Sequence, residues 1–377
     1  MNALCFFPWF ALDDEITIGK YRLIPYKRVT LPAGRDNEKQ KILDSVLSHY
    51  YAILNKPINE ATLVLLDGKE LLEQLNQEDT DSIFVFAELF AFSNLSKRSF
   101  FGMPQFDYCN RDLFRVMITH FKDATGGYNL TQRRRDGTTS TLYSKDAFKV
   151  FKSKHIFKPM AIQFDSRLLE SLTNAQTNLA QNHWACIYES IVNFNFANTD
   201  SLEITEAVEV VFTIGAFERL LCNSKGKIND LAKAFTKVLT TNNVIMPKDV
   251  QRFADNVDPK KLYKSTSVRD LWIRDFYSLR NNLAHGKIEH GYNSIWVLKD
   301  HLLLSSYIFP LLVKATLTEH QLYTFTEEDR FQIDVFESLA CEEHCIPKEI
   351  NTTEDDSIEA EQPWQRIISK AYFERYF

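Results

Sequence analysis

The sequence predicts an α+β fold, with an N-terminal mixed α/β domain followed by a C-terminal all-α bundle. Apolar and polar residues alternate from Ile16 to Ile24, as in a half-buried strand, and Gly19 is expected to form a bulge in it. From about Asp165 the spacing changes to that of amphipathic helices. The clearest helical stripe consists of Ile204, Ala207, Val208, Val211 and Gly215.

Residues 1–160 form the predicted mixed domain, whose role we expect to be sensing or positioning. The apolar run 61–66 ends at the turn signal Asp67-Gly68, which is typical of a strand. A second apolar run, 82–92, is expected to be buried, although its pattern fits a strand or a helix. Gly126-Gly127 and Asp136-Gly137 punctuate a predicted hairpin.

This hairpin region is strongly basic. Residues 131–160 contain eight Lys and Arg residues against two acids, and aromatic residues are interspersed among them. Basic groups can follow a phosphate backbone while bases stack on aromatic rings, so Arg133, Arg134, Arg135 and Lys145 are candidate RNA-binding residues. The alternative is an ordinary solvated hairpin tip whose aromatic residues belong to the core.

Residues 165–320 form the predicted helical domain, because four or more helical segments in this length suit a bundle. The last of them is expected over 294–318, with a kink or break at Pro310. Residues 321–377 form a predicted acidic helical extension. Within it, Thr326 and Asp329 indicate a capping box for a helix that ends near residue 340, followed by an acidic linker and an apolar helix over 364–372. That last helix is expected to dock on its own chain or on a partner protomer.

The composition restricts the class of protein. A chain of 377 residues that is 45% apolar and contains 29 Phe residues is an ordinary globular protein. Its six scattered cysteines predict a reducing cytoplasm rather than a disulfide framework. We find no continuous apolar run of the length that predicts a membrane span. The net charge of −6 means that any attraction to nucleic acid must be local.

The candidate active site is the segment 279–286, which follows a helical run that begins at Val268. Arg280 is followed at once by the amide residue Asn281, and His285 precedes Gly286. Arginine presents a permanently charged fork of donors that fits phosphate. Histidine exchanges protons near neutral pH. This pair suits chemistry on a phosphodiester, where one group stabilises charge and the other moves a proton.

The spacing also predicts where the motif lies. Five residues at about 100° each place the side chains of Arg280 and His285 roughly 140° apart on an ideal helix. Gly286 predicts a helix C-terminus, because glycine tolerates the left-handed conformation that ends helices. We therefore expect the motif at a helix end, or completed by a second copy from another protomer. The alternative is structural: Arg280 pairs with an acid such as Asp275, and His285 caps its own helix.

The run Arg280-Asn281-Asn282-Leu283-Ala284-His285 resembles the Arg-polar-x-x-x-His signature of the HEPN superfamily (higher eukaryotes and prokaryotes nucleotide-binding). Many members of that superfamily are metal-independent ribonucleases. The helical segment 204–221 resembles the first long helix of the ApeA-like HEPN branch, which is known from bacterial anti-phage proteins. The resemblance covers about residues 165–320.

The resemblance implies a metal-independent endoribonuclease that acts in anti-phage defence or in a toxin-like abortive response. His285 would act as general base or acid around the ribose 2′-hydroxyl and the leaving 5′-oxygen. Arg280 would stabilise the charge that builds on the phosphorane, and Asn281 would orient the substrate or its neighbours. Two motifs would meet across a dimer, so the implied partners are RNA, a second copy of the chain and a phage-derived or nucleotide trigger.

The resemblance implies no cofactor and no metal. The segment 341–345 (Cys-Glu-Glu-His-Cys) offers three soft ligands, whereas a structural zinc site needs four. One alternative function remains open at this stage. Some HEPN domains have no nuclease activity and bind RNA, a nucleotide or a partner protein, and the acidic net charge favours such a module.

Overall fold

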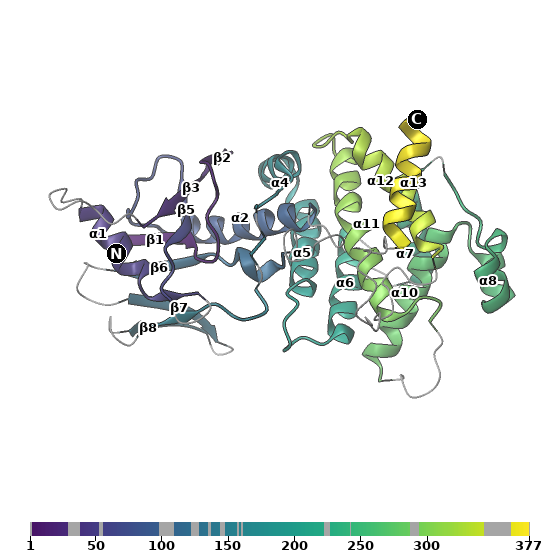
Figure 1. Cartoon of the computed structure of the whole chain (residues 1–377), viewed down its shortest axis with the longest axis horizontal. Helices are drawn as coiled ribbons and strands as arrows, with labels where there is room; N and C mark the ends of the chain where they lie inside the picture. Colours follow the sequence, from purple (N-terminus) through teal and green to yellow (C-terminus); the bar gives the residue numbers. More distant parts are fainter. Residues whose placement is uncertain are drawn as a thin grey trace, which may run out of the picture. The chain divides into compact units, whose positions relative to one another are not determined.

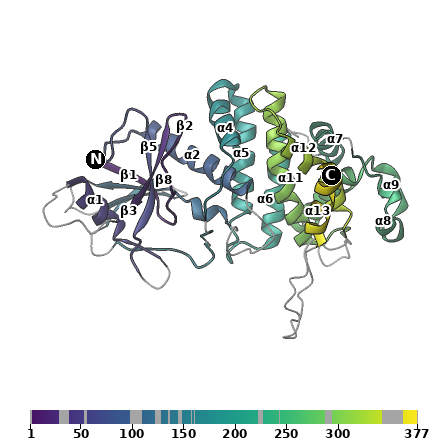
Figure 2. The same ribbon diagram turned by 45° about the horizontal axis from the view of Figure 1, so that its top comes forward.

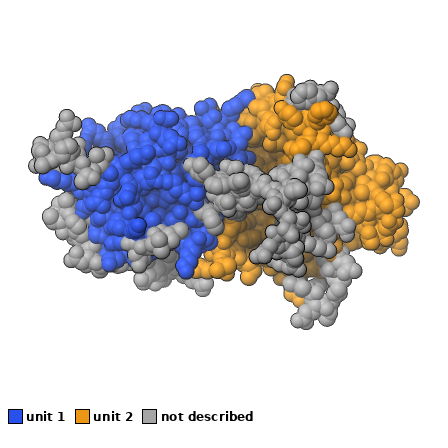
Figure 3. Space-filling model, viewed as in Figure 1, with its two compact units in different colours: residues 1–173 blue, residues 174–377 orange. Residues whose placement is uncertain are grey.

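The structure is a computed structural model that describes residues 2–28, 38–52, 56–97, 109–121, 128–134, 137–143, 148–156, 158–159, 161–221, 227–241, 243–286, 294–342 and 363–376. The chain is divided into two compact units, residues 1–173 and 174–377, which Figure 3 shows in blue and orange. The first unit contains an antiparallel sheet and the second is helical (Figure 1), so the fold class is α+β, as predicted.

Within the described residues, the first unit is built on a seven-stranded sheet in the order β2-β3-β5-β1-β6-β7-β8, in which every neighbouring pair is antiparallel. Its strands are β1 (Asn2–Phe7), β2 (Ile16–Ile18), β3 (Tyr21–Lys27), β5 (Glu60–Leu66), β6 (Met117–Phe121), β7 (Tyr128–Arg134) and β8 (Gly137–Tyr143). Two short strands, β4 (Tyr50–Tyr51) and β9 (Val150–Phe151), pair in parallel. The predicted hairpin is confirmed, because β7 pairs with β8 up to Arg134 and Gly137.

The segment from Ile16 to Ile24 is two strands rather than one bulged strand. Ile18 pairs with Tyr21, so Gly19 and Lys20 form a two-residue hairpin loop, with Gly19 at φ +55°. Glycine at the first position of such a loop is favoured because other residues are strained there. The alternation of apolar and polar residues is interrupted at this loop, which a single-strand interpretation of the pattern missed.

The long helix α2 (Gln77–Leu95) supplies the aromatic core of this unit. It contains the apolar run 82–92, which is therefore a helix. The ring of Tyr21 stacks on Phe86 with centroids 4.0 Å apart, and Phe7 contacts Phe90 at 5.6 Å. These contacts come from β3 and β1, so α2 covers one face of the sheet. A shorter helix, α1 (Glu38–Leu47), contributes Asp44, whose carboxylate accepts a hydrogen bond from Tyr26 of β3 at 2.7 Å.

The helix α4 (Ser166–Asn178) contains the boundary between the units, which lies after Thr173. The second unit is formed by α5 (Gln181–Ala197), α6 (Glu206–Leu220), α7 (Ile228–Val238), α8 (Gln251–Asn256), α9 (Pro259–Lys264), α10 (Val268–Ala284), α11 (Leu298–Glu319), α12 (Glu327–Ala340) and α13 (Pro363–Tyr376). Figure 2 shows α6, α11 and α12 packed side by side, with α8 and α9 at the edge of the unit. Residues 321–377, which we assigned to an extension, thus contribute α12 and α13 to this unit.

The core of the second unit is built around α10. Trp272 of this helix is fully buried and contacts Phe217 of α6 at 6.0 Å and Phe336 of α12 at 5.2 Å between ring centroids. The predicted helix is confirmed as α6, but the prediction of its buried face is wrong. The structure buries Ile214 and Phe217, whereas Val208 of the predicted stripe is 40% exposed. Apolar residues lie on several sides of α6, so their spacing alone does not select one face.

The helix α11 is long and apolar enough to cross a membrane by length and mean composition, although it contains no continuous apolar run of that length. Most of it is buried inside the second unit, where it contacts α6 and α12. Such burial is typical of a core helix. The helix begins at Leu298 rather than at residue 294, and it does not break at Pro310 but continues to Glu319.

A buried ion pair joins α11 to the start of α12. The ammonium of Lys314 lies 2.6 Å from Asp329, and both side chains are almost completely buried. The backbone N–H and the hydroxyl of Thr326 donate to the Asp329 carboxylate, and the backbone N–H of Asp329 donates to the Thr326 hydroxyl oxygen, so the predicted capping box is confirmed. Burial raises the pKa of the Asp329 carboxyl, but Lys314 and Thr326 outweigh it and hold that pKa below its usual range.

We predict that Asp329→Ala lowers the free energy of unfolding by about 3–5 kcal/mol, because it removes the carboxylate that pairs with the buried Lys314 ammonium. Because the folded-state pKa of Asp329 is lowered, the stabilisation is present above the unfolded pKa of about 3.9. It is lost as the pH falls through the lower folded-state value. Urea unfolding at a series of pH values measures both effects. The control is Glu327→Ala, an exposed acid in the same turn; equal losses in the two variants would contradict the prediction.

Candidate active site

The helix α10 begins in the core and ends at the surface, where the motif lies. At its start, the side chain of Ser267 accepts a hydrogen bond from the backbone N–H of Asp270 at 3.2 Å, and the following residues up to Tyr277 are buried except Arg274. Beyond Tyr277 only Leu279 is buried, and the last residues are exposed. The helix ends at Ala284, with His285 as its cap and Gly286 at φ +64°. The predicted helix end is therefore confirmed.

The guanidinium of Arg280 is held by residues of two helices. Its Nη2 lies 3.3 Å from a carboxylate oxygen of Glu218 on α6, and its Nη1 donates to Asn281 Oδ1 at 2.9 Å. Its Cζ lies 5.7 Å from the centre of the Tyr277 ring. The Arg280 side chain is 28% exposed, while its Nε is buried and has no hydrogen-bond partner within the described part of the chain.

Glu218 is the acid that the sequence analysis missed. Burial raises the pKa of its carboxyl, and the nearby Arg280 guanidinium opposes that shift only in part. Glu218 lies sixty-two residues before Arg280 in the sequence, so no spacing rule connects them. The packing of α6 against α10 brings the two side chains together, and the sequence alone does not reveal that packing.

Asp275, the acid that we considered as a partner of Arg280, has another role. Its Oδ2 accepts hydrogen bonds from the backbone N–H of Ile295 at 2.7 Å and from the Ser294 hydroxyl at 2.8 Å. The same oxygen lies 3.2 Å from Nε2 of His301, which is fully buried and stacks on Phe276. Asp275 thus fixes the segment that leads into α11. The structural alternative is therefore wrong in naming Asp275, but Arg280 does pair with an acid, Glu218, and His285 does cap its own helix.

His285 lies at the exposed end of α10. Its backbone N–H donates to the carbonyl of Asn281 at 3.1 Å, which completes the helix. Within the described residues, no hydrogen bond or ion pair involves its imidazole, and none joins it to Arg280. Within the described part of the chain, one copy of the motif therefore presents an anchored cation and an exposed imidazole that do not contact each other.

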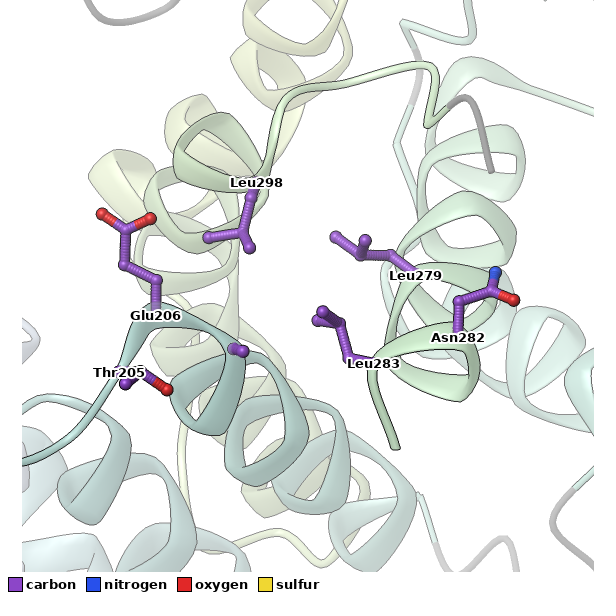
Figure 4. A pocket seen from close by; sticks show the side chains of 7 residues that line it. Thr205, Glu206, Leu279, Asn282, Leu283 and Leu298 are labelled. Carbon is purple, nitrogen blue, oxygen red and sulfur yellow. The ribbon is translucent and has the colours of Figure 1, made fainter. Parts of the chain in front are cut away.

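A cavity of about 540 Å³ opens beside the motif, between the start of α6, the end of α10 and the start of α11. Figure 4 shows Leu279 and Leu283 of α10 and Leu298 of α11 pointing towards one another across it, while the amide of Asn282 is turned away. Thr205 and Glu206 form its polar side. The cavity lies within the size range of ligand sites, and its leucine side chains suit an apolar group better than a charged one.

Only the backbone of the basic hairpin strands is described. Arg133 and Arg134 belong to β7, but their side chains are not described, and Arg135 and Lys145 lie outside the described residues. Their predicted contact with RNA stays a prediction. His344 and Cys345 also lie outside, and within the described residues no group of three or more metal-binding side chains is found.

Comparisons with protein-family models, with curated proteins and with solved structures find no match to this chain.

Proposed function

We propose that the second unit is a metal-independent endoribonuclease of HEPN type, acting in anti-phage defence or in a toxin-like abortive response. One observation carries this proposal. At the end of α10, Arg280 is anchored by Glu218, while His285, about one turn further on, is exposed. A positioned cation that stabilises charge and an accessible imidazole that moves protons are the two kinds of group that suit cleavage of a phosphodiester when the substrate supplies the nucleophile.

The nucleophile is the 2′-hydroxyl of the RNA itself. Its oxygen attacks the adjacent phosphorus, the bond from phosphorus to the 5′-oxygen breaks, and the products are a 2′,3′-cyclic phosphate and a 5′-hydroxyl. One imidazole removes the proton from the 2′-oxygen, and an acid must deliver a proton to the 5′-oxygen. A single neutral His285 performs the first task but not both at once, so we assign the second to the His285 of another protomer.

Arg280 stabilises the extra negative charge on the phosphorane. Its fork suits this role because guanidinium donors match phosphate oxygens in pairs. Asn281 acts on Arg280 rather than on the RNA, since its amide oxygen accepts a hydrogen bond from Arg280 Nη1 at 2.9 Å. Glu218 and Asn281 together hold the guanidinium in one orientation before substrate arrives, which is the preorganisation that makes electrostatic stabilisation effective.

A second candidate function has one observation in its favour. The carboxylate of Glu218 already occupies one side of the Arg280 guanidinium. If a phosphate does not displace or share this contact, the domain binds RNA, a nucleotide or a partner protein without cleaving it. The half-exposed last turn of α10 and its cavity would then form the binding surface.

We predict that His285→Ala reduces the rate of RNA cleavage by roughly 10²–10⁴-fold, the usual contribution of a positioned acid or base. Arg280→Ala should lose at least as much. Arg280→Lys should not restore full activity, because lysine keeps the charge but lacks the planar fork. Single-turnover cleavage of labelled RNA measures these rates.

The matched control is His183→Ala, which removes another exposed histidine, on α5 of the same unit. It should cleave like the wild type. Circular dichroism of each variant shows whether the fold is retained, as expected for a side chain at an exposed helix end. If His285→Ala cleaves as fast as His183→Ala, His285 does not transfer the proton and the proposed mechanism is wrong.

We also predict that the active protein is at least a homodimer with the α10 ends of two protomers at the interface. The reason is the roughly 140° between Arg280 and His285 on the helix, together with the need for two imidazoles. Light scattering after size exclusion measures the mass in solution. A monomer at micromolar concentration with full cleavage activity would rule out the shared site.

A further inference from the structure

The small parallel sheet of the first unit carries a pair of aromatic rings on its outer face. In this sheet Tyr50 of β4 lies opposite Val150 of β9, and Tyr51 lies opposite Phe151. Successive side chains of a strand point to opposite faces. Tyr50 is fully buried, and its ring centroid lies 4.9 Å from that of Phe6. Tyr51 and Phe151 therefore belong to the face that is turned away from the core.

The two outer rings form a partly exposed stack. The ring centroids of Tyr51 and Phe151 are 5.2 Å apart, and the ring planes are inclined by 27°. Phe151 is 52% exposed, whereas phenylalanine is usually buried, and Tyr51 is half-buried. Much of the Phe151 ring is therefore accessible to another flat ring.

The two strands and their flanks are basic. The segments 49–58 and 148–159 contain neither Asp nor Glu, and they contain five lysines: Lys56, Lys149, Lys152, Lys154 and Lys158. In the described part of the chain, only Lys158 among these five forms an ion pair, with Glu60. The surface around the rings therefore keeps an excess of positive charge in a protein whose net charge is −6.

The nearest other acid is already balanced. Asp112 lies 3.0 Å from Nε2 of His155, which belongs to the second basic segment. The same carboxylate pairs with Arg111 and with Arg115, each at 3.3 Å. Asp112 therefore does not neutralise the lysines beside the rings.

Two of the lysines are placed to meet an anion beside the rings. Lys149 comes two residues before Phe151 and is exposed like it, and its ammonium lies 5.9 Å from the centre of the Tyr51 ring. An ammonium above a ring keeps its charge and can still donate to an anion. Lys154 is exposed. Burial lowers the pKa of Lys152, and the nearby charge of Lys158 lowers it further, as expected where acids do not balance the lysines.

This combination selects the kind of ligand. Unpaired bases stack on accessible aromatic rings, while lysines neutralise the phosphates that join the bases. A duplex would use the lysines but not the ring, because its bases already stack on one another. An acidic peptide would likewise leave the ring without a flat partner.

We propose that the surface formed by Tyr51, Phe151, Lys149 and Lys154 binds single-stranded nucleic acid, with a base stacked on Phe151 and phosphates held by the two lysines. Stacking and phosphate contact are common to RNA and DNA, so both are tested below. The proposal gives the first unit a binding function of its own. It does not depend on cleavage by the second unit.

The first test is Phe151→Ala, made in a His285→Ala background so that RNA is not cut. Fluorescence anisotropy with labelled single-stranded RNA, and with DNA of the same base sequence, gives the affinities. Loss of one stacked base should weaken binding roughly 5–150-fold. Phe151→Tyr keeps a flat ring and should bind like the parent, whereas Phe151→Leu keeps only the apolar character and should behave like Phe151→Ala. The matched control is Phe84→Ala, an exposed phenylalanine on α2 of the same unit, which should retain the parent affinity.

The second test is Lys149→Ala/Lys154→Ala in the same background. Loss of two phosphate contacts should make the slope of log affinity against log salt shallower by about 1.4. The matched control is Lys20→Ala/Lys39→Ala, which removes two exposed lysines at the other end of β5, beside Asp67 and Glu70. It should retain the parent slope.

Several results would overturn the proposal. They are an unchanged affinity for both RNA and DNA in Phe151→Ala, an equal loss in Phe84→Ala, or an equal loss in affinity for a duplex of the same sequence. Sedimentation with phosphatidylserine vesicles tests the other anionic surface that lysines and an exposed ring can contact. If Phe151→Ala loses vesicle binding but keeps its affinity for the single strands, the ligand is a membrane and the assignment to nucleic acid is wrong.

Discussion

The buried carboxylate of Asp275 is the interaction on which the candidate site depends. Its Oδ2 accepts hydrogen bonds from the backbone N–H of Ile295 and from the hydroxyl of Ser294. The same oxygen lies 3.2 Å from Nε2 of His301. These contacts tie the start of α11 to the middle of α10. Because Leu298 at that start lines the cavity of about 540 Å³, Asp275 also sets the shape of the surface beside the motif. Replacing it would leave buried donors without an acceptor, which is costly in a core.

The same helix has to satisfy two opposite requirements. Its first part is packed among aromatic side chains such as Trp272, which fixes its axis, and its last turn leaves the core and is exposed to solvent. Arg280 remains attached to α6 through Glu218, whereas His285 is exposed. A rigid helix is a more precise support for reacting groups than a loop. In the proposed function, this division lets a few polar residues of an acidic protein act on a polyanion.

Local patterns in the sequence were sufficient for features that depend on neighbouring residues. The capping box of Thr326 and Asp329 depends on a spacing of three, and it is present. A pattern failed where one residue changed the direction of the chain, as at Gly19, where a turn replaces the expected bulge. Contacts between distant segments could not be predicted from the sequence. The pair of Arg280 with Glu218 joins two helices whose packing follows from the whole core, so residue spacing carries no information about it.

The central claim is that RNA supplies its own nucleophile and that the protein needs no metal to use it. Analysis of the ends of RNA cut by the wild-type protein in the presence of a chelator tests this claim most directly. The account predicts 2′,3′-cyclic phosphate and 5′-hydroxyl ends, and no cut at a position where a deoxyribose replaces the ribose. Cleavage that requires a divalent metal, or that leaves 3′-hydroxyl and 5′-phosphate ends, would contradict it.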